Sequence, residues 1–220
     1  MIKNDFVEIV ARNYAWIKGF EAAAFEIHDR VNQKYGDMLP YGFHLKMTAS
    51  YVSRYGYLVA KTEEDILILY AAAYLHDSIE DARLTFNDLV RFISEFKVEG
   101  FILPENILQQ IRWDVPEIVY ALTNEKGRNR KERANAAYYE GIRNTKFASF
   151  VKMCDRLANI HYTTLFFFAN RMLDVYRREH EDFIISISEG AVTPVPEEMK
   201  KEALRLLHDE CYVISNKVLL

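Results

Sequence analysis

The chain has 220 residues, 50% of them hydrophobic and 14% aromatic, so it can bury a sizeable core in one domain or two small ones. Its formal net charge of −4 gives no indication of nucleic acid or an anionic membrane as a partner. The N-terminus lacks the apolar stretch of a signal peptide, and the longest apolar run, Ile66 to Leu75, is well short of the ~20 residues that span a bilayer. Cys154 and Cys211 form neither a metal nor a redox spacing. We therefore expect a soluble, cytoplasmic protein.

Apolar residues recur with helical spacing along the whole chain, whereas alternating strand patterns are hard to find. The pattern predicts one long helix over about 5–34, a turn around 36–40 and a helix over about 44–55. Glu63, Glu64 and Asp65 place negative charge at the start of the next helix, where the helix dipole favours it. This helix is apolar all round, which predicts a central position covered on all sides.

The second half of the chain continues in the same way. Thr85 resembles the cap of a helix to about residue 96, and Pro104 and Pro116 are expected near helix starts. Further helices are predicted over about 146–168, 170–187 and 196–218, with a loop over 190–196. No linker, repeat or low-complexity tract is evident. We expect an all-α fold of about nine or ten helices, in a single domain over residues 1–220.

The most informative stretch is 71–81, where an apolar run ends abruptly in one histidine and three carboxylates. Removing charges from water is costly unless they are paired or bind a metal. His76 and Asp77 are therefore expected to bind a metal ion at the end of a buried helix. Glu80 and Asp81 lie one turn later, at spacings that bring them to the same side.

Two more residues have the character of ligands. His44 follows a turn at a predicted helix start, and Asp155 lies in an otherwise largely apolar helix, where Asn159 shares its face. A set of two histidines and two aspartates suits Mn, Fe or Zn better than Ca or Mg. The alternative for Asp155 is an ion pair with Arg156 or Arg171. His28 has no spacing that demands a ligand role, and we expect a structural or surface position for it.

Four short motifs, in this order, make the chain resemble a known family. They are Pro40-Tyr41-x-x-His44, Leu75-His76-Asp77-x-x-Glu80-Asp81, Leu122-Thr123-x-x-Lys126 and Lys152-x-x-Asp155-Arg156-Leu157-x-Asn159. They contain the H…HD…D signature of the HD-domain phosphohydrolases. The set resembles the hydrolase domain of RelA/SpoT proteins, which removes the 3′-pyrophosphate of the alarmone (p)ppGpp. The match covers about residues 20–178, and with no synthetase domain following, the chain looks like a small single-domain alarmone hydrolase.

The resemblance implies an HD-domain helical bundle that binds one divalent ion, usually Mn²⁺ in this family, although other divalent transition metals suit the same ligands. The implied ligands are His44, His76, Asp77 and Asp155. Glu80 and Asp81 are the implied catalytic residues, suited to orient and deprotonate water, and adjacent carboxylates near a cation can differ in pKa. The implied reaction converts ppGpp and water to GDP and pyrophosphate.

The expected substrate contacts are less uniform. Asn159 resembles the family asparagine near the ribose. Extra residues lie between His28 and Pro40, and Lys34 is then the expected basic contact to the guanine. Residues 126–133 hold five cations in eight residues, and we expect Thr123, Lys126 and Arg130 to face the phosphates. The alternative for this cluster is a solvated surface.

Two other functions compete with this one. The first is an HD phosphohydrolase acting on another nucleotide or on a 2′- or 3′-phosphate such as that of NADPH, which the departures before Pro40 keep open. The second is a catalytically inactive module that binds a nucleotide for regulation. The intact Glu80-Asp81 pair disfavours it, because a sensor needs no group that activates water.

Overall fold

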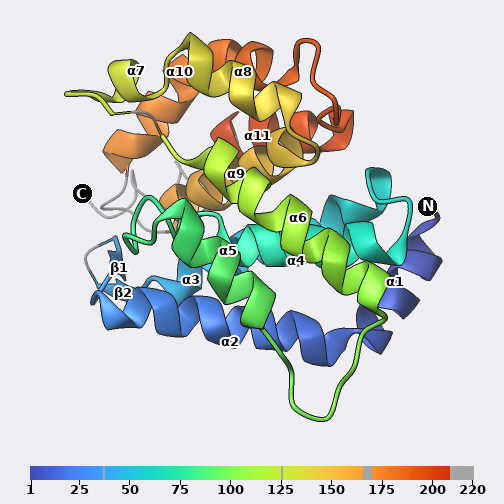
Figure 1. The fold of residues 1–220 in the computed structure, drawn as a ribbon. Coiled ribbons are helices and arrows are strands. Elements are labelled where there is room, and N and C mark those ends of the chain that lie inside the picture. The colour runs from blue at the N-terminus through green and yellow to red at the C-terminus, as the bar shows by residue number, and fades with distance from the viewer. Residues whose placement is uncertain (37, 125, 166–169, 209–220) are drawn as a thin grey trace.

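A computed structural model describes residues 1–36, 38–124, 126–165 and 170–208 of the chain (Figure 1). Its helices are α1 (Lys3–Arg12), α2 (Tyr14–Arg30), α3 (Gly42–Tyr55), α4 (Glu63–Leu75), α5 (Phe86–Glu95), α6 (Glu105–Leu122), α7 (Arg130–Arg133), α8 (Ala136–Asn144), α9 (Ala148–Leu165), α10 (Asn170–Ser188) and α11 (Glu197–His208). A 3₁₀ helix, η1 (Gly56–Leu58), and two short strands, β1 (Lys34–Tyr35) and β2 (Leu39–Pro40), complete the described part. Within it, every α-helix except the single-turn α7 has nine or more residues, which confirms the predicted all-α fold.

Helix α4 lies at the centre of the molecule, as its sequence predicts. Every residue from Asp65 to Leu75 is buried. The helix begins with a capping box, in which the Thr62 hydroxyl accepts from the Asp65 amide at 3.3 Å and Asp65 accepts from the Thr62 amide at 3.3 Å. A helix with apolar side chains at every position is stable in water only if neighbouring elements cover all of its faces.

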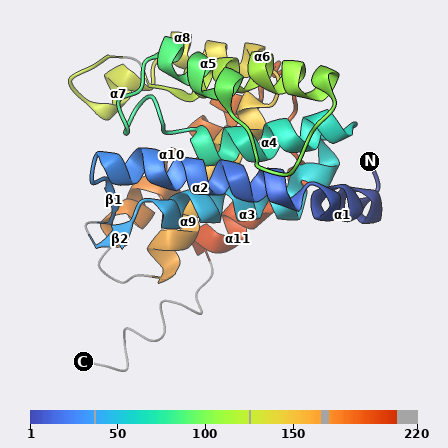
Figure 2. The same ribbon diagram turned by 60° about the horizontal axis from the view of Figure 1, so that its bottom comes forward.

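Those neighbours are α2, α3, α6 and α9, which all pack against α4. In Figure 2, α5 and α6 lie on one side of α4, and α3, α9 and α11 lie on the other. The buried hydrophobic residues of the described chain form one contiguous core that extends from Phe6 to Leu207. The position and direction of α4 are therefore set by packing over its whole length.

The predicted helix over 5–34 is wrong as a single element, because Asn13 interrupts it between α1 and α2. Asn13 is only 5% exposed, and its side-chain amide donates to the Ile9 carbonyl at 3.0 Å and to Glu63 at 2.5 Å. A short polar side chain that bonds to the backbone competes with helix continuation. The break lets α2 turn to lie along α4.

Two smaller expectations also differ. Pro116 lies inside α6 and not at a helix start, whereas Pro104 is the N-cap residue of α6. The last two residues of the turn expected around 36–40 form strand β2, which pairs with β1, so the turn itself is shorter than predicted. These strands are too short to give an alternating sequence pattern. Gly36 between them has a φ of +57°, and a Cβ atom there would lie 1.8 Å from the Tyr162 hydroxyl, so the hairpin requires glycine.

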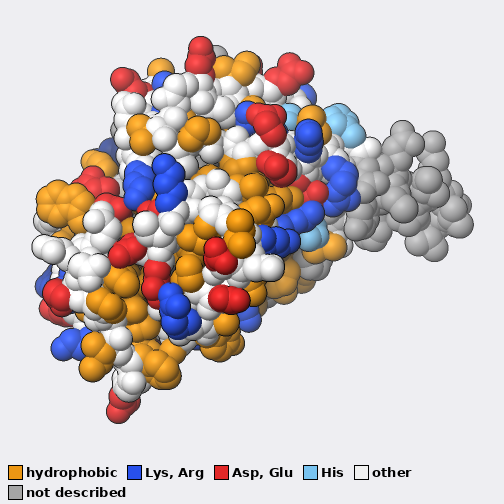
Figure 3. Space-filling model, turned by 90° about the vertical axis from the view of Figure 1, so that its right-hand side faces the viewer, with side chains coloured by type: hydrophobic (Ala, Val, Ile, Leu, Met, Phe, Trp, Pro, Cys, Tyr) orange, Lys and Arg blue, Asp and Glu red, His pale blue; other side chains and the backbone are white. Residues whose placement is uncertain are grey.

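The helices predicted over 146–168 and 196–218 exist as α9 and α11, and the structure describes them as far as Leu165 and His208. The remaining parts of both predictions, with Cys211, lie outside the described residues. Among the described helices, none is long and apolar enough to cross a membrane. On the face shown in Figure 3, basic and acidic side chains are interspersed and neither sign predominates.

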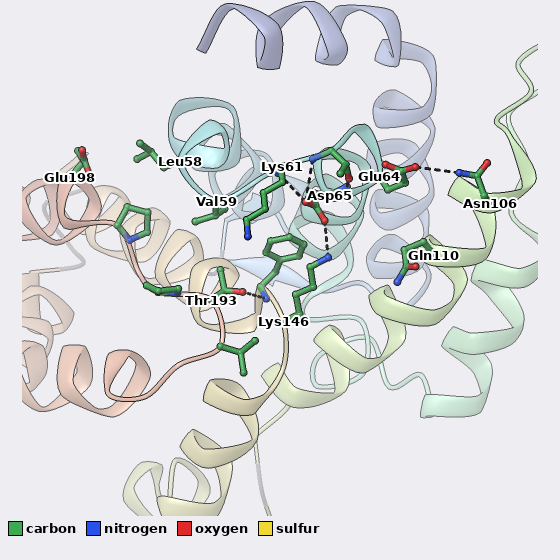
Figure 4. A pocket seen from close by; sticks show the side chains of 15 residues that line it. Leu58, Val59, Lys61, Glu64, Asp65, Asn106, Gln110, Lys146, Thr193 and Glu198 are labelled. Atoms are coloured by element: carbon green, nitrogen blue, oxygen red, sulfur yellow. Dashed lines mark hydrogen bonds and ion pairs between the residues drawn. The ribbon is translucent and has the colours of Figure 1, made fainter. Parts of the chain in front are cut away.

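A cavity of about 990 Å³ opens at the start of α4 (Figure 4). Asp65 lies in its wall and accepts from the Lys146 ammonium at 2.7 Å, in addition to its capping bonds. Across the cavity, the Thr193 hydroxyl accepts from the Phe147 amide at 2.9 Å. From Asp65 to Leu75, the end of α4, the helix rises ~15 Å, so this cavity is well separated from the residues that follow Leu75.

We predict that Asp65→Ala lowers the free energy of unfolding by ~1–3 kcal/mol, because it removes a helix cap and the partner of Lys146 together. Asp88→Ala is the matched control, since Asp88 has the same place in the capping box of α5 but is exposed. Its effect should be clearly smaller in urea unfolding followed by circular dichroism. Equal losses in the two variants would contradict a special role for the start of α4.

Candidate metal centre

Four residues that are far apart in the sequence converge beyond the end of α4. His44 comes from the first turn of α3, His76 and Asp77 directly follow α4, and Asp155 lies in the middle of α9. The two histidine Nε2 atoms are 3.1 Å apart. Asp77 Oδ2 lies 3.4 Å from the His44 nitrogen and 2.9 Å from that of His76. Asp155 Oδ1 lies 3.4 Å and 3.8 Å from the same two nitrogens.

Four of these five separations fit a shared cation, and the fifth, 3.8 Å between His76 and Asp155, is longer. Donor atoms ~2.1 Å from one ion, at angles of 90–110°, lie ~3.0–3.4 Å from one another. Ligand atoms of His44, His76 and Asp77 all lie within 4.8 Å of one another, and Asp155 approaches both histidines from α9. Two imidazole nitrogens with carboxylate oxygens are a donor set for a transition metal, as the residue types predict.

The two histidines are oriented by different contacts. His76 Nδ1 lies 2.9 Å from the Ala73 carbonyl oxygen, which can only accept, so this nitrogen carries the hydrogen. In the neutral ring, Nε2 then presents its lone pair to the cluster, an arrangement typical of metal-binding histidines. The His44 ring stacks on Tyr35 at 4.8 Å between centroids, and its Nδ1 has no hydrogen-bond partner among the described residues.

The electrostatics of the cluster favour positive charge. Burial lowers the pKa of His44, but its hydrogen bonds to Asp155 and Asp77 outweigh burial and raise this pKa to about 9. Burial opposes ionisation of Asp77, yet the neighbouring His76 and His44 hold the pKa of its carboxyl well below the usual range. A field that attracts a proton this strongly attracts a metal cation in the same place.

Tyr41 links the cluster to the predicted catalytic pair. Its hydroxyl lies 2.6 Å from Asp77 Oδ2 and 2.5 Å from Asp81 Oδ2. A single phenolic hydrogen cannot serve two carboxylates, so one of them must carry a proton for both contacts to be favourable. Burial and the charge of Asp77 raise the pKa of Asp81, which makes Asp81 the carboxyl that is protonated more readily.

Glu80 is held from a different side. Its carboxylate accepts from the Asn124 side-chain amide at 2.7 Å and from the Asn124 backbone amide at 3.3 Å. Asn124 follows α6 directly after Thr123. The two adjacent carboxylates thus face different partners, with Glu80 turned toward α6 and Asp81 toward Tyr41.

A cavity of about 200 Å³ adjoins the cluster at Asp155. Its polar lining combines carboxylates and amides with four cations; these residues are Glu80, Asp155, Asn124, Asn159, Arg130, Arg133, Lys152 and Arg156. Lys152 donates to Asp155 at 3.0 Å, so among the described lysines and arginines the ion-pair partner of Asp155 is Lys152 and not Arg156 or Arg171. Arg156 lies between the rings of Tyr176 and Phe183, at 4.7 Å and 4.0 Å.

The predicted substrate residues divide into two groups. Asn159 and Arg130 line the cavity; Asn159 donates to Asp155 at 2.5 Å, and Arg130 pairs with Glu179 on α10 at 3.0 Å. Lys34, Thr123 and Lys126 do not line it. Lys34 is exposed on β1, whereas the Thr123 hydroxyl donates back to the Val119 carbonyl at 2.9 Å.

Several contacts at the site were not predicted from the sequence. Tyr35 donates to Asn159 at 2.8 Å and stacks on His44, so it supports two predicted site residues at once. Tyr41 and Lys152 are specified positions of the Pro40-Tyr41-x-x-His44 and Lys152-x-x-Asp155 motifs, and this could have indicated that they contact the site. Asn124 occupies an unspecified position of the Leu122-Thr123-x-x-Lys126 motif, so the motif gave no signal for it, and its contact depends on where α6 ends relative to Glu80.

No family model, curated protein or solved structure matches this chain. Membership of the HD-domain family therefore stays a prediction from the sequence motifs.

His28, near the end of α2, lies against the cluster. It is 0% exposed, and burial lowers its pKa to about 4, against the attraction of Asp77 and Asp29. The neighbouring His76 and His44 also disfavour its protonation. In the folded protein His28 is therefore neutral over most of the range in which an exposed histidine would titrate.

We predict that this histidine destabilises the metal-free protein in acid. His28 binds a proton near pH 6.5 in the unfolded chain but only near pH 4 in the folded protein. The contribution of neutral His28 to the free energy of unfolding is therefore fully present above pH 6.5 and is lost as the pH falls toward 4. His28→Phe should remove this loss. Between pH 7 and 4.5 its free energy of unfolding should gain ~2–3 kcal/mol on the wild type, measured by urea unfolding with a chelator present. Parallel pH profiles would contradict the prediction.

Proposed function

We propose that this protein is a metal-dependent phosphohydrolase. One observation carries the proposal: two histidines and two aspartates converge beside a cavity that combines carboxylates with four cations. When bound, a divalent cation would polarise a phosphoryl oxygen and acidify a nearby water molecule. The cationic lining suits a substrate with several phosphate charges.

The side chains around the proposed metal have separate roles in binding the phosphates and in transferring protons. Lys152 and Arg156 are largely buried at the cavity, where their charges are less screened than on the surface. Glu80, held by Asn124, is the proposed base that takes a proton from the attacking water. Asp81, whose pKa is raised, is the proposed acid that returns a proton to the leaving group.

A narrower proposal names the substrate as a guanosine 3′-pyrophosphate of the ppGpp type, converted to GDP and pyrophosphate with Mn²⁺. The four ordered motifs support it, as does the contact of Asn159 with Tyr35 and Asp155. The cavity of about 200 Å³ is below the ~300–1,000 Å³ typical of whole small-molecule sites. It suits a pyrophosphate group, with the nucleoside outside it.

The second candidate is an HD phosphohydrolase for another nucleotide or for the 2′-phosphate of NADPH. The position of Lys34 favours this second candidate, because Lys34 is the expected contact to a guanine, yet it is exposed and does not line the cavity. An inactive regulatory module is the third. A panel of nucleotides incubated with the purified protein and Mn²⁺ separates the three: pyrophosphate from ppGpp supports the first, turnover of other substrates alone the second, and binding without turnover the third.

We predict that Asp77→Ala lowers Mn²⁺ affinity by more than ~100-fold, because it removes a proposed metal ligand, the carboxylate oxygen that lies beside both histidine nitrogens. Free Mn²⁺ measured by electron paramagnetic resonance during titration gives the affinity directly. Asp88→Ala, which changes an exposed aspartate on α5, is the matched control and should bind as the wild type does. An unchanged Mn²⁺ affinity in Asp77→Ala would show that the metal does not bind at this site.

We predict that Glu80→Gln retains Mn²⁺ but lowers the hydrolysis rate by ~10²–10⁴-fold, the usual effect of losing a general base. The glutamine oxygen can still accept from Asn124, so the local structure should persist. Steady-state kinetics on the best substrate of the panel, with metal binding measured in parallel, tests this. Full activity in Glu80→Gln would rule out the proposed base.

A further inference from the structure

His28 is a buried polar side chain whose polarity has no evident use within the protein. Neither of its ring nitrogens has a hydrogen-bond partner among the described residues. Burying such a group without a partner costs stability, and a phenylalanine would fill similar space without this cost. Its ring nevertheless stacks on an aromatic side chain that is hydrogen-bonded to the candidate metal centre.

That contact is a parallel stack on Tyr41. The ring centroids are 4.4 Å apart and the planes differ by 10°. The other aromatic neighbours of Tyr41 approach it edge-on: Tyr35 at 6.1 Å and 87°, and His44 at 5.6 Å and 68°. Of these three, His28 is therefore the one that covers a face of the Tyr41 ring and limits its tilt out of plane.

The tilt of this ring matters because its hydroxyl reaches two carboxylates. Tyr41 Oη lies 2.6 Å from Asp77 Oδ2 and 2.5 Å from Asp81 Oδ2, while Asp77 Oδ2 also faces both histidine nitrogens. A small rotation of the ring moves the hydroxyl at its far end away from both acceptors. Hydrogen bonds of this kind to a ligand carboxylate commonly change metal affinity or activity by ~10–100-fold.

We infer that His28 is a positioning residue, which acts through the Tyr41 ring to hold Asp77 and Asp81 in their relative orientation. This inference rests on the proposed function, because it takes Asp77 as a metal ligand. The flat ring is the part that acts, and the ring nitrogens are not required. His28 makes no contact with the substrate in this role.

Two variants of similar size separate the ring from the volume that it fills. His28→Leu fills the buried site without a flat face and should lower Mn²⁺ affinity by ~10-fold, whereas His28→Phe keeps the stack and should stay within ~2-fold of the wild type. Tyr41→Phe should lower affinity by ~10–100-fold, because it removes the hydroxyl. In the Tyr41→Phe background, His28→Leu should have no further effect, since the link to Asp77 is already lost.

The four variants and the wild type are compared by Mn²⁺ titration with electron paramagnetic resonance, after urea unfolding has verified that all five proteins are folded at the assay temperature. A full additional loss from His28→Leu in the Tyr41→Phe background overturns the inference, because it would show a general structural effect. So does an equal loss in His28→Phe and His28→Leu. The readout needs no turnover, so a wild type that binds Mn²⁺ but hydrolyses nothing would overturn the proposed reaction and leave this result standing. A wild type that binds no Mn²⁺ would overturn both.

Discussion

The complete burial of α4 is the constraint on which the rest of the structure depends. A helix that is apolar on every face can exist in water only inside a shell, which α2, α3, α6 and α9 provide. The chain leaves this shell at Leu75, and the next two side chains are a histidine and an aspartate. Because α3 and α9 both pack on α4, His44 and Asp155 are brought to the same point.

The charges at this point are tolerable because each is held by specific partners. His76 donates to a backbone carbonyl, Asp77 accepts from Tyr41, and Asp155 accepts from Lys152 and Asn159. Buried polar groups are stable only when such contacts are nearly complete. The contacts also order the site, since each one restricts a group that the proposed chemistry needs in a single orientation.

Much of this arrangement could be predicted from local sequence signals. The acidic start and uniform hydrophobicity of α4 predict its boundaries and central position, and the capping threonine predicts α5. The prediction failed where a tertiary contact outweighed the local pattern. Asn13 interrupts a good helical sequence because its side chain bonds to Ile9 and Glu63, and the second of these partners is distant in the sequence.

The sequence by itself determined the types of residue at the candidate site and their order, because the cost of burying charge restricts where His76, Asp77 and Asp155 can occur. Only the tertiary structure decided which neighbours face the site. On the short strand β1, adjacent side chains point to opposite sides, so Tyr35 contacts His44 while Lys34 is exposed. In the basic segment, Arg130 lines the cavity and Lys126 does not. Local spacing contains no information on such choices, because they depend on where distant helices end.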